Sequence, residues 1–219
     1  MPGRKIPLVE NRIYHIVSRS IEKYRIFRNR KDYERMKELL KYYQVKKPPF
    51  KYSLYLEIKD KEKIGQENFL ENEKLVEIIS YCLMPTHIHL LLKQVAENGI
   101  SIYMGRILNS YAKYFNTKYK RKGPLWESRF KSIEVETKEE LYHLTRYIHL
   151  NPVTAYLVEN PEDWNFSSYK EFINEKGVNE KICNFEEFLE INKDEYIDFV
   201  ISRKDYQREL DKIKRLLLE

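Results

Sequence analysis

The nine residues Met84-Pro85-Thr86-His87-Ile88-His89-Leu90-Leu91-Leu92, MPTHIHLLL, decide the fold of this chain. They place a Pro-Thr turn between two apolar runs, 75–84 and 87–93, which predicts two consecutive antiparallel strands. Alternate residues of a strand point to opposite faces of its sheet. His87 and His89 therefore project together from one face, while Ile88 and Leu90 turn toward the other face and the core.

Two neighbouring imidazoles on one face are a pair of nitrogen ligands suited to a divalent metal such as zinc, manganese or magnesium. An isolated His-x-His motif is more often a pair of hydrogen-bonded surface histidines, so a third ligand is needed to decide between the two. His87 and His89 are two of only five histidines in the chain.

The hydrophobic pattern outside this stretch predicts an α+β fold with a mainly antiparallel sheet flanked by helices, in the order β-α-β-β-β-α-β-α. A helical C-terminal extension follows, and we expect a catalytic domain over 1–170 and an acidic tail over 171–219. The charged stretch 59–74 is interpreted as a loop or insertion. Strands are expected at 13–18, 52–58, 75–84, 87–93 and 129–136, and helices at 31–45, 101–119 and 137–150.

Capping residues refine two of these helices. Ser101 is a candidate N-cap, and the helix it opens is expected to bury Ile102, Ile107, Leu108, Tyr111 and Phe115. Thr137 followed by Glu140 forms a capping box at the start of the last predicted helix. We expect that helix to end near Asn151-Pro152.

The last predicted helix also supplies a candidate third ligand. Tyr147 and Asn151 lie four residues apart and share a helix face, on which Asn151 offers a carbonyl oxygen and Tyr147 a phenol. His143 lies on the same face one turn earlier, whereas His149 does not. Taken alone, Tyr147 is one of 18 tyrosines and a packing role is the simpler interpretation.

Charge is distributed unevenly along the chain, whose net charge is +6. Residues 1–51 carry 15 Lys and Arg against 5 acidic residues, and residues 101–131 carry 8 against 1, whereas residues 171–219 carry 9 against 13. This pattern favours a polyanion-binding face within the first 170 residues. The two distant cysteines, together with the lack of a signal-peptide core or an apolar run of membrane length, predict a reduced, cytoplasmic protein.

Four separated motifs resemble the REP-associated tyrosine transposases, a group of the HUH single-tyrosine, IS200-like transposases. The resemblance covers about residues 13–169. The motifs are YCLMPTHIHLLL (81–92), GPLWESRFKS (123–132), RYIHLNPV (146–153) and DWNFSSY (163–169). It implies an HUH or ferredoxin-like core. The stretch 59–74 and the tail after residue 170 match nothing in the family pattern.

The resemblance implies a metal-dependent transesterification on single-stranded DNA, near hairpins formed by palindromic repeats. His87, His89 and Asn151 would hold Mg²⁺ or Mn²⁺, and Tyr147 would be the nucleophile that forms a 5′-phosphotyrosine. His143 is a candidate general base or supporting group. The enzyme would act as a monomer or a homodimer, without a membrane partner.

Contacts to DNA are expected from basic residues in the two positive blocks, where tyrosines interleave with lysines in a manner suited to single strands or hairpins. Trp126 and Trp164 are expected to be scaffold residues. The candidate DNA-binding residues are Arg19, Lys113, Lys118, Lys120, Arg121, Lys122, Arg129 and Lys131.

Three other functions remain open from the sequence. An HUH nickase of the replication-initiator or relaxase type would share the metal and tyrosine chemistry but not the RYIHLNP and DWNFSSY motifs. A non-cleaving regulator would bind hairpins on the same fold, and a hydrolase of small phosphoesters would need neither Tyr147 nor a basic face. A further hypothesis is that the acidic tail folds over the basic face and limits activity.

Overall fold

A four-stranded antiparallel sheet forms the centre of the computed structural model, which describes residues 7–58, 73–127, 129–173 and 181–209. The strands are β1 (Ile13–Arg19), β2 (Val76–Met84), β3 (His87–Gln94) and β4 (Lys131–Val135). Their order across the sheet is β2-β3-β1-β4, and each neighbouring pair is antiparallel. The predicted α+β class and antiparallel sheet are confirmed.

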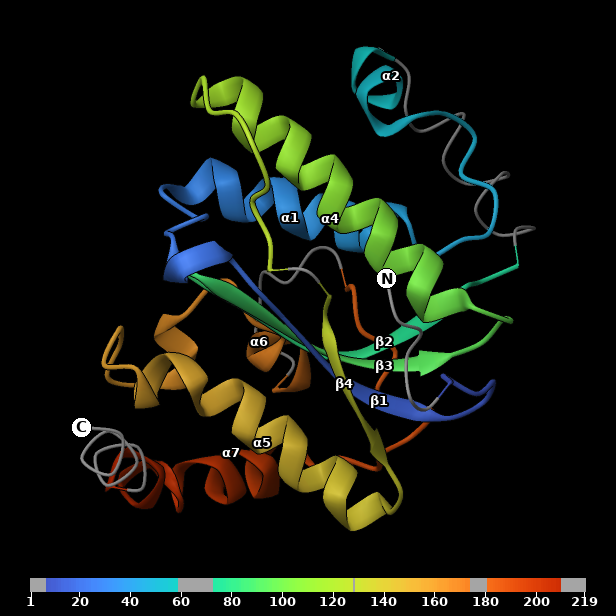
Figure 1. Ribbon diagram of the computed structural model, residues 1–219. Coiled ribbons are helices and arrows are strands. Elements are labelled where there is room, and N and C mark those ends of the chain that lie inside the picture. Colours follow the sequence, from blue (N-terminus) through green and yellow to red (C-terminus); the bar gives the residue numbers. More distant parts are fainter. Residues whose placement is uncertain (1–6, 59–72, 128, 174–180, 210–219) are drawn as a thin grey trace.

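Helices cover both faces of this sheet, so that the molecule has three layers (Figure 1). Two long helices, α1 (Arg30–Tyr42) and α4 (Gly99–Lys118), lie on one face, and α5 (Lys138–Thr154) lies on the other with α6 (Tyr169–Phe172) and α7 (Lys193–Ile201). Short elements complete the fold: α2 (Tyr52–Glu57), η1 (Ile21–Lys23) and η2 (Pro161–Asp163). Within the described residues, no helix is both long and apolar enough to cross a membrane.

The strand register places the histidines on one face of the sheet and core residues on the other. Val17 lies opposite His89, and Arg19 lies opposite His87, so these four side chains share one face of the sheet. Ile88, one residue from both histidines, is completely buried among apolar residues of the core. The prediction that the histidines project together and away from Ile88 agrees with this register.

Two of the four motifs, DWNFSSY and GPLWESRFKS, form backbone hydrogen bonds with the strands or the residues just beyond them and do not contain His87, His89 or Tyr147. In DWNFSSY, the backbone of Phe166 and Ser168 pairs with β2 through bonds from Leu83 N to Phe166 O and from Ser168 N to Tyr81 O. It thereby covers a strand edge that would otherwise expose unpaired backbone groups. In GPLWE, the Ile21 amide donates to Leu125 O. The indole nitrogens of Trp126 and Trp164 donate to the carbonyl oxygens of Leu108 and Leu83 respectively, in keeping with the scaffold roles expected of both.

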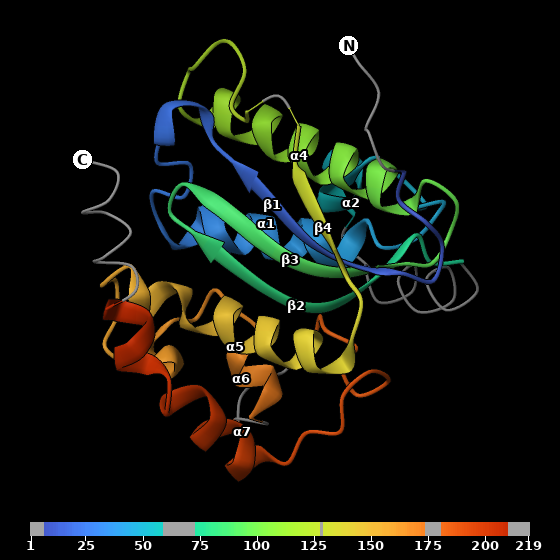
Figure 2. The same cartoon turned by 60° about the horizontal axis from the view of Figure 1, so that its bottom comes forward.

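The described part of the acidic tail packs beside α5, on the face of the sheet opposite α4 (Figure 2). Its Tyr196 and Val200 are fully buried in the same apolar cluster as the strands. Residues 181–209 therefore do not lie over α4, which carries part of the second basic block, because two of their apolar side chains are buried against α5. The hypothesis that the tail folds over the basic face and limits activity stays a prediction. Residues 210–219 lie outside the described part of the chain.

A buried histidine joins the tail to the sheet. His149 on α5 is 0% exposed. Its Nε2 lies 3.2 Å from Ser80 Oγ on β2 and 2.8 Å from Ser168 Oγ, while its Nδ1 lies 2.7 Å from the Tyr196 hydroxyl of α7. Tyr196 in turn donates to Thr145 Oγ1 at 2.9 Å. Burial lowers the pKa of His149 to about 3, so its ring is neutral at neutral pH.

Several predicted boundaries are wrong, and one element is of the wrong type. The strand expected at 52–58 is the helix α2, in which Tyr52 and Tyr55, three residues apart, both pack against Tyr42. In so short a segment, the aromatic residues fit both the alternating pattern of a strand and the spacing of a helix, so the pattern does not distinguish the two. Of the predicted insertion 59–74, residues 59–72 lie outside the described residues.

The helices α4 and α5 also differ from expectation. α4 begins at Gly99 with Asn98, not Ser101, at its N-cap, and Ile102 is 40% exposed. Gly99 is required there because a Cβ atom would lie 2.2 Å from the Leu75 carbonyl oxygen. The capping box at Thr137 and Glu140 is confirmed, but α5 continues through Pro152 to Thr154. Packing of buried Pro152 and Val153 outweighs the helix-breaking tendency of proline.

We predict that Tyr196→Phe lowers the free energy of unfolding by about 1–3 kcal/mol, because it removes the acceptor for the buried His149 N–H. Urea denaturation measures this change. The matched control is Tyr206→Phe, whose side chain is 52% exposed and whose loss of a hydroxyl should change stability by less than about 0.5 kcal/mol. Equal stability of the two variants would contradict the role given to the His149 network.

Candidate active site

The two histidines of the MPTHIHLLL stretch lie side by side on the α5 face of the sheet. The His87 and His89 ring centroids are 5.0 Å apart in an edge-to-face arrangement. Each ring uses its Nδ1 atom in a hydrogen bond within the protein: His87 Nδ1 lies 3.0 Å from Thr86 Oγ1, and His89 Nδ1 lies 3.0 Å from His15 Nε2. The Nε2 atom of each ring is therefore the nitrogen left to bind a ligand.

A third histidine, His15 on β1, belongs to the site and was missed by the sequence reasoning. Its ring stacks on that of His89 with centroids 5.3 Å apart and an interplanar angle of 16°. His15 is 8% exposed. Its position in a predicted strand was a weak signal, but the contact joins residues 74 positions apart in sequence and depends on how β1 pairs with β3.

The exposed tyrosine of α5 faces this group of imidazoles. The Tyr147 ring meets His89 edge to face at 5.8 Å and His15 at 6.1 Å between centroids, and 41% of the Tyr147 side chain is exposed. Asn151 follows one turn later and donates from Nδ2 to the Tyr147 carbonyl oxygen at 2.9 Å. This bond orients the amide and leaves its Oδ1 as an acceptor. The structure thus brings His87, His89 and Tyr147 together, with Asn151 on the adjacent helical turn.

The three imidazoles of the site are neutral at pH 7. Burial lowers the pKa of His15 to about 4. Burial, followed by the charge of Arg19, lowers the pKa of His87 to about 4, and burial followed by the neighbouring His87 holds the pKa of His89 well below its usual value. Neutral imidazole is the form that binds a metal ion.

The donors present suit a divalent cation with few protein ligands. Two Nε2 atoms and an amide oxygen provide nitrogen and oxygen donors of the kind that Mn²⁺ and Mg²⁺ accept, with positions left for a phosphate oxygen and water. Among the described residues, no group of three or more His, Cys, Asp or Glu side chains is arranged to hold a metal. His15, His87 and His89 are therefore not arranged as a three-histidine site, and His15 Nε2 is engaged with His89.

His143 is directed away from the imidazoles. Its Nδ1 lies 2.9 Å from an Arg146 guanidinium nitrogen, its Nε2 lies 3.8 Å from Glu139, and its ring lies 5.5 Å from that of Phe199 on α7. These contacts place His143 on the side of α5 that faces the tail, which does not favour it as a general base for Tyr147.

The predicted DNA-binding residues fall into separate regions. Arg19 and Lys131 are exposed and lie on the same sheet face as the imidazoles, Arg19 directly opposite His87 and Lys131 opposite Val17. Lys113 and Lys118 belong to α4 on the other face. Past the end of α4, Lys120 and Lys122 are exposed, Arg121 bonds to Asn116, and Arg129 is exposed just before β4.

Lys118 has a structural partner that the sequence did not reveal. Its ammonium group lies 2.6 Å from the carboxylate of Asp32, which is 0% exposed. Tyr114 and Tyr119 also donate to this carboxylate, at 3.0 and 2.7 Å. A buried carboxylate needs such partners, so the charge of Lys118 is already compensated within the protein.

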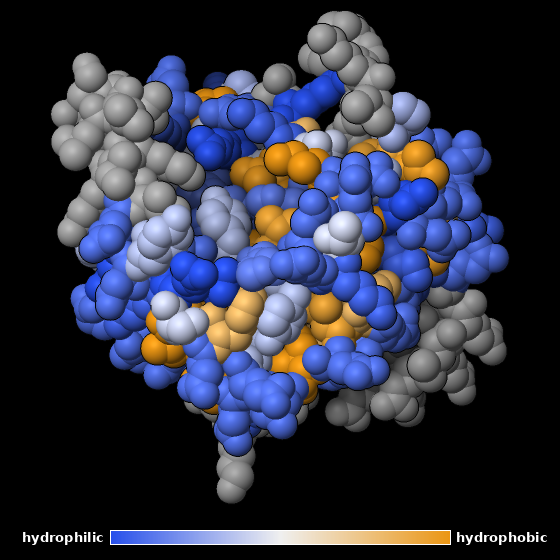
Figure 3. Space-filling view, turned by 90° about the horizontal axis from the view of Figure 1, so that it is seen from below, coloured by the Kyte–Doolittle hydropathy of each residue, from blue (hydrophilic) through white to orange (hydrophobic). Residues whose placement is uncertain are grey.

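The surface around α5 is mostly hydrophilic, with hydrophobic residues in separate small patches (Figure 3). Exposed hydrophobic side chains on this side include Ile133 and Tyr147 beside the imidazoles. A polar surface with an exposed phenol suits a hydrated, charged ligand better than an apolar one.

Known proteins that are similar in sequence come from the family that the four motifs resemble. Residues 58–151 match the family described as "Transposase IS200 like", a span that contains His87, His89, Tyr147 and Asn151. A relative from Haemophilus influenzae that carries the name REP-associated tyrosine transposase is 31% identical over 105 residues, which make up 42% of this chain. The aligned residues span 58% of that relative's length.

The fold agrees with a solved structure of a REP-associated tyrosine transposase bound to a REP hairpin. That structure superposes with a TM-score of 0.53, covers 88% of this chain and 99% of its own, and is 15% identical. At this identity the likeness concerns the fold. The fold is thus that of the REP-associated structure, and the IS200-like transposase family, which residues 58–151 match, is the one that the four motifs predicted.

Proposed function

We propose that the chain is a metal-dependent transposase that cleaves and rejoins single-stranded DNA beside hairpins of palindromic repeats, with Tyr147 as the nucleophile. The observation that carries this proposal is the exposed Tyr147 phenol packed against His89 of the His-x-His pair, with Asn151 on the next turn of the same helix. The name of the Haemophilus relative and the hairpin bound in the similar structure support the choice of DNA and of hairpins.

In this proposal His87 and His89 would hold the cation through the ring nitrogens left free by their Nδ1 bonds, and Asn151 would add an amide oxygen. A divalent cation in this position supplies Lewis-acid chemistry, polarising the scissile phosphate and offsetting its negative charge. Thr86 and His15 keep the two imidazoles in one orientation through their Nδ1 atoms. Arg19, exposed and opposite His87, is suited to pair with a neighbouring phosphate.

The chemical step is an exchange of one phosphodiester for another. The Tyr147 hydroxyl oxygen bonds to the phosphorus, the bond from phosphorus to the 3′ oxygen breaks, and the phenol proton passes by way of solvent to that 3′ oxygen, which leaves as a hydroxyl. The product is a 5′-phosphotyrosine, and attack by a 3′ hydroxyl in the reverse sense rejoins the strand without ATP.

We predict that Tyr147→Phe abolishes covalent capture of DNA, lowering adduct formation by at least about a thousandfold, because no other phenol can occupy its place. The measurement is a denaturing gel after incubation with Mn²⁺ and a library of single-stranded hairpins, followed by sequencing of the trapped DNA. His87→Ala should also lose the adduct, since it removes one metal ligand.

Tyr156→Phe is the matched control for this assay. Tyr156 is 47% exposed just beyond the end of α5 and nine residues from Tyr147. One residue along a helix rotates a side chain by about 100°, so neighbouring tyrosines should not replace Tyr147. An adduct that persists in Tyr147→Phe would refute the nucleophile assignment, and tight binding without any adduct would favour a non-cleaving regulator.

We further predict that His15→Phe weakens Mn²⁺ binding by about 10–100-fold, because it keeps a stacked ring but removes the hydrogen bond that orients His89. Isothermal titration calorimetry of the DNA-free protein measures this without any cleavage step. His15→Gln retains a side-chain amide and should recover part of the affinity. An Mn²⁺ affinity unchanged in His15→Phe would show that His15 only packs against His89.

A further inference from the structure

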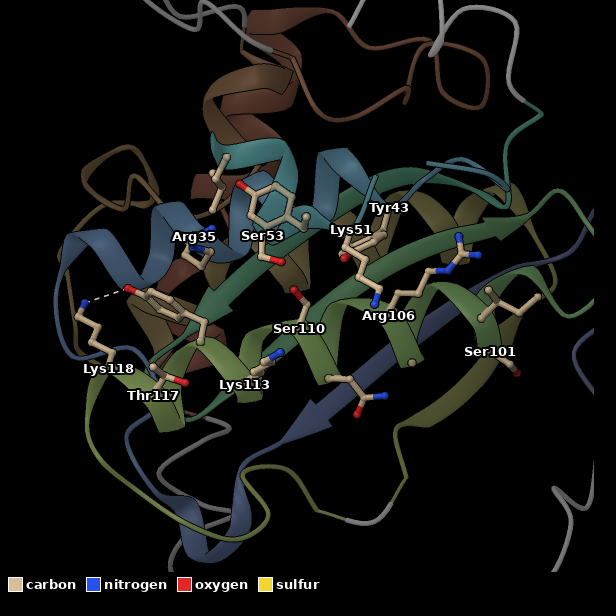
Figure 4. A pocket seen from close by; sticks show the side chains of 16 residues that line it. Arg35, Tyr43, Lys51, Ser53, Ser101, Arg106, Ser110, Lys113, Thr117 and Lys118 are labelled. Atoms are coloured by element: carbon tan, nitrogen blue, oxygen red, sulfur yellow. Dashed lines mark hydrogen bonds between the residues drawn. The ribbon is translucent and has the colours of Figure 1, made fainter. Parts of the chain in front are cut away.

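A groove runs along α4 on the face of the molecule opposite Tyr147. It has a volume of about 790 Å³ and is enclosed by α4 on one side and by α1, α2 and the segment between them on the other. Figure 4 shows Lys51, the residue before α2, and Ser53 of α2 facing Arg106, Ser110 and Lys113 of α4 across this space. None of these residues belongs to the group of imidazoles around Tyr147.

The walls of the groove are held in place by hydrogen bonds and ring contacts. Arg106 donates to the carbonyl oxygens of Val45 and Lys46, at 3.1 Å each, which ties the segment after α1 to α4. Tyr52 of α2 is buried and packs edge to face on Tyr42 at 5.0 Å. The groove is thus formed before any ligand arrives, which lowers the entropic cost of binding.

The lining of the groove is strongly positive. The described residues that line it include no Asp or Glu but five cations: Arg35, Lys51, Arg106, Lys113 and Lys118. Lys118 is neutralised by Asp32, and Arg35 lies over the rings of Tyr52 and Tyr114 at 5.1 and 4.8 Å. Lys51 and Lys113 are exposed, and no described acidic residue pairs with either of them. Hydroxyl groups of Ser53, Ser110 and Thr117 add neutral donors.

The shape of the groove favours a linear polyanion over a single nucleotide. Its α4 residues come in adjacent pairs that recur every four positions, and from Ser101 to Thr117 they span about 24 Å at 1.5 Å per residue. Successive phosphates of a helical strand are about 3.4 Å apart along its axis, so this length spans several of them. Gly105 lines the groove and faces open space, since a Cβ atom there would meet nothing within 4 Å.

We propose that this groove is a second nucleic-acid site, which binds the phosphate backbone of a single strand of DNA through Lys51, Lys113 and the neighbouring hydroxyl groups. That the strand is DNA rests on the proposed function. The sheet separates the groove from Tyr147, so the bound strand is a part of the DNA other than the one being cleaved. Lys51 to Ser53 precede residue 58, where the family match begins, so this wall lies outside the matched domain.

The first test removes charge from the groove. In a Tyr147→Phe background without metal, fluorescence anisotropy with an unstructured oligonucleotide of about twelve bases measures affinity as salt is varied. Lys51→Gln with Lys113→Gln should weaken binding about tenfold near 0.1 M salt and reduce the slope of log affinity against log salt by about 1.4, or about 0.7 for each phosphate contact. The matched control replaces Lys138 and Lys193, exposed residues of α5 and α7.

The second test fills the groove at Gly105. Gly105→Gln and Gly105→Glu have nearly equal volume, and both residues have a higher helix propensity than glycine, so both variants should fold. Glu places a negative charge in the groove and should bind the oligonucleotide at least about tenfold more weakly than Gln. Equal affinity of these two variants, or an equal loss in the Lys138 and Lys193 control, overturns the proposal.

The outcomes also separate this proposal from the proposed function. The groove variants are then placed in the chain with Tyr147 intact, and adduct formation is measured at saturating DNA. If groove variants lose affinity while no chain forms an adduct, the groove proposal stands and the catalytic proposal fails. If adducts form but groove variants bind as tightly as the unaltered chain, the catalytic proposal stands and the groove proposal fails.

Discussion

The buried imidazole of His149 fixes the rotation of α5, and the geometry of the site depends on that rotation. Its ring is bonded to Ser80 on β2, to Ser168 beside β2 and to Tyr196 of α7. Tyr147 lies two residues earlier, about 200° around the helix. With His149 held against β2 and α7, Tyr147 must project toward β3 and β1, where it meets His89 and His15. The buried hydrogen-bond network of His149 thus sets the direction in which the exposed Tyr147 phenol projects.

The sheet separates the imidazoles and Tyr147 on one face of the molecule from the positively charged groove on the other. On the α5 face, three imidazoles with lowered pKa values lie beside the tyrosine. On the α1 and α4 face, the groove is lined by cations, and none of the described residues that line it is acidic. The period of two in a strand makes this division possible, because adjacent residues of β3 serve opposite faces. His89 belongs to the site while Ile88 belongs to the core.

The family motifs have different physical roles in the fold. MPTHIHLLL and RYIHLNPV supply His87 and His89, the Tyr147 phenol and the Asn151 amide, whereas His15 comes from β1. DWNFSSY covers the edge of β2, and its Ser168 also bonds to His149. The tail after residue 170 carries no family motif, yet Tyr196 supplies the last bond of the same network. A segment without recognisable motifs therefore contributes directly to the position of the helix that bears Tyr147.

The sequence by itself determined the features encoded by near neighbours: the turn and strand pair around Pro85, the shared face of His87 and His89 and the capping box at Thr137. Its four motifs also predicted the transposase family that residues 58–151 match. It predicted a strand where Tyr52–Glu57 is a helix, because six residues fit the periods of both elements. It could not predict contacts between residues distant in the sequence. The pairing of β1 with β3 brings His15 into contact with His89. Packing of α1 on α4 allows Lys118 to form its ion pair with the buried carboxylate of Asp32. Local periodicity follows from backbone geometry, whereas strand register and helix rotation are set only when the whole core is packed.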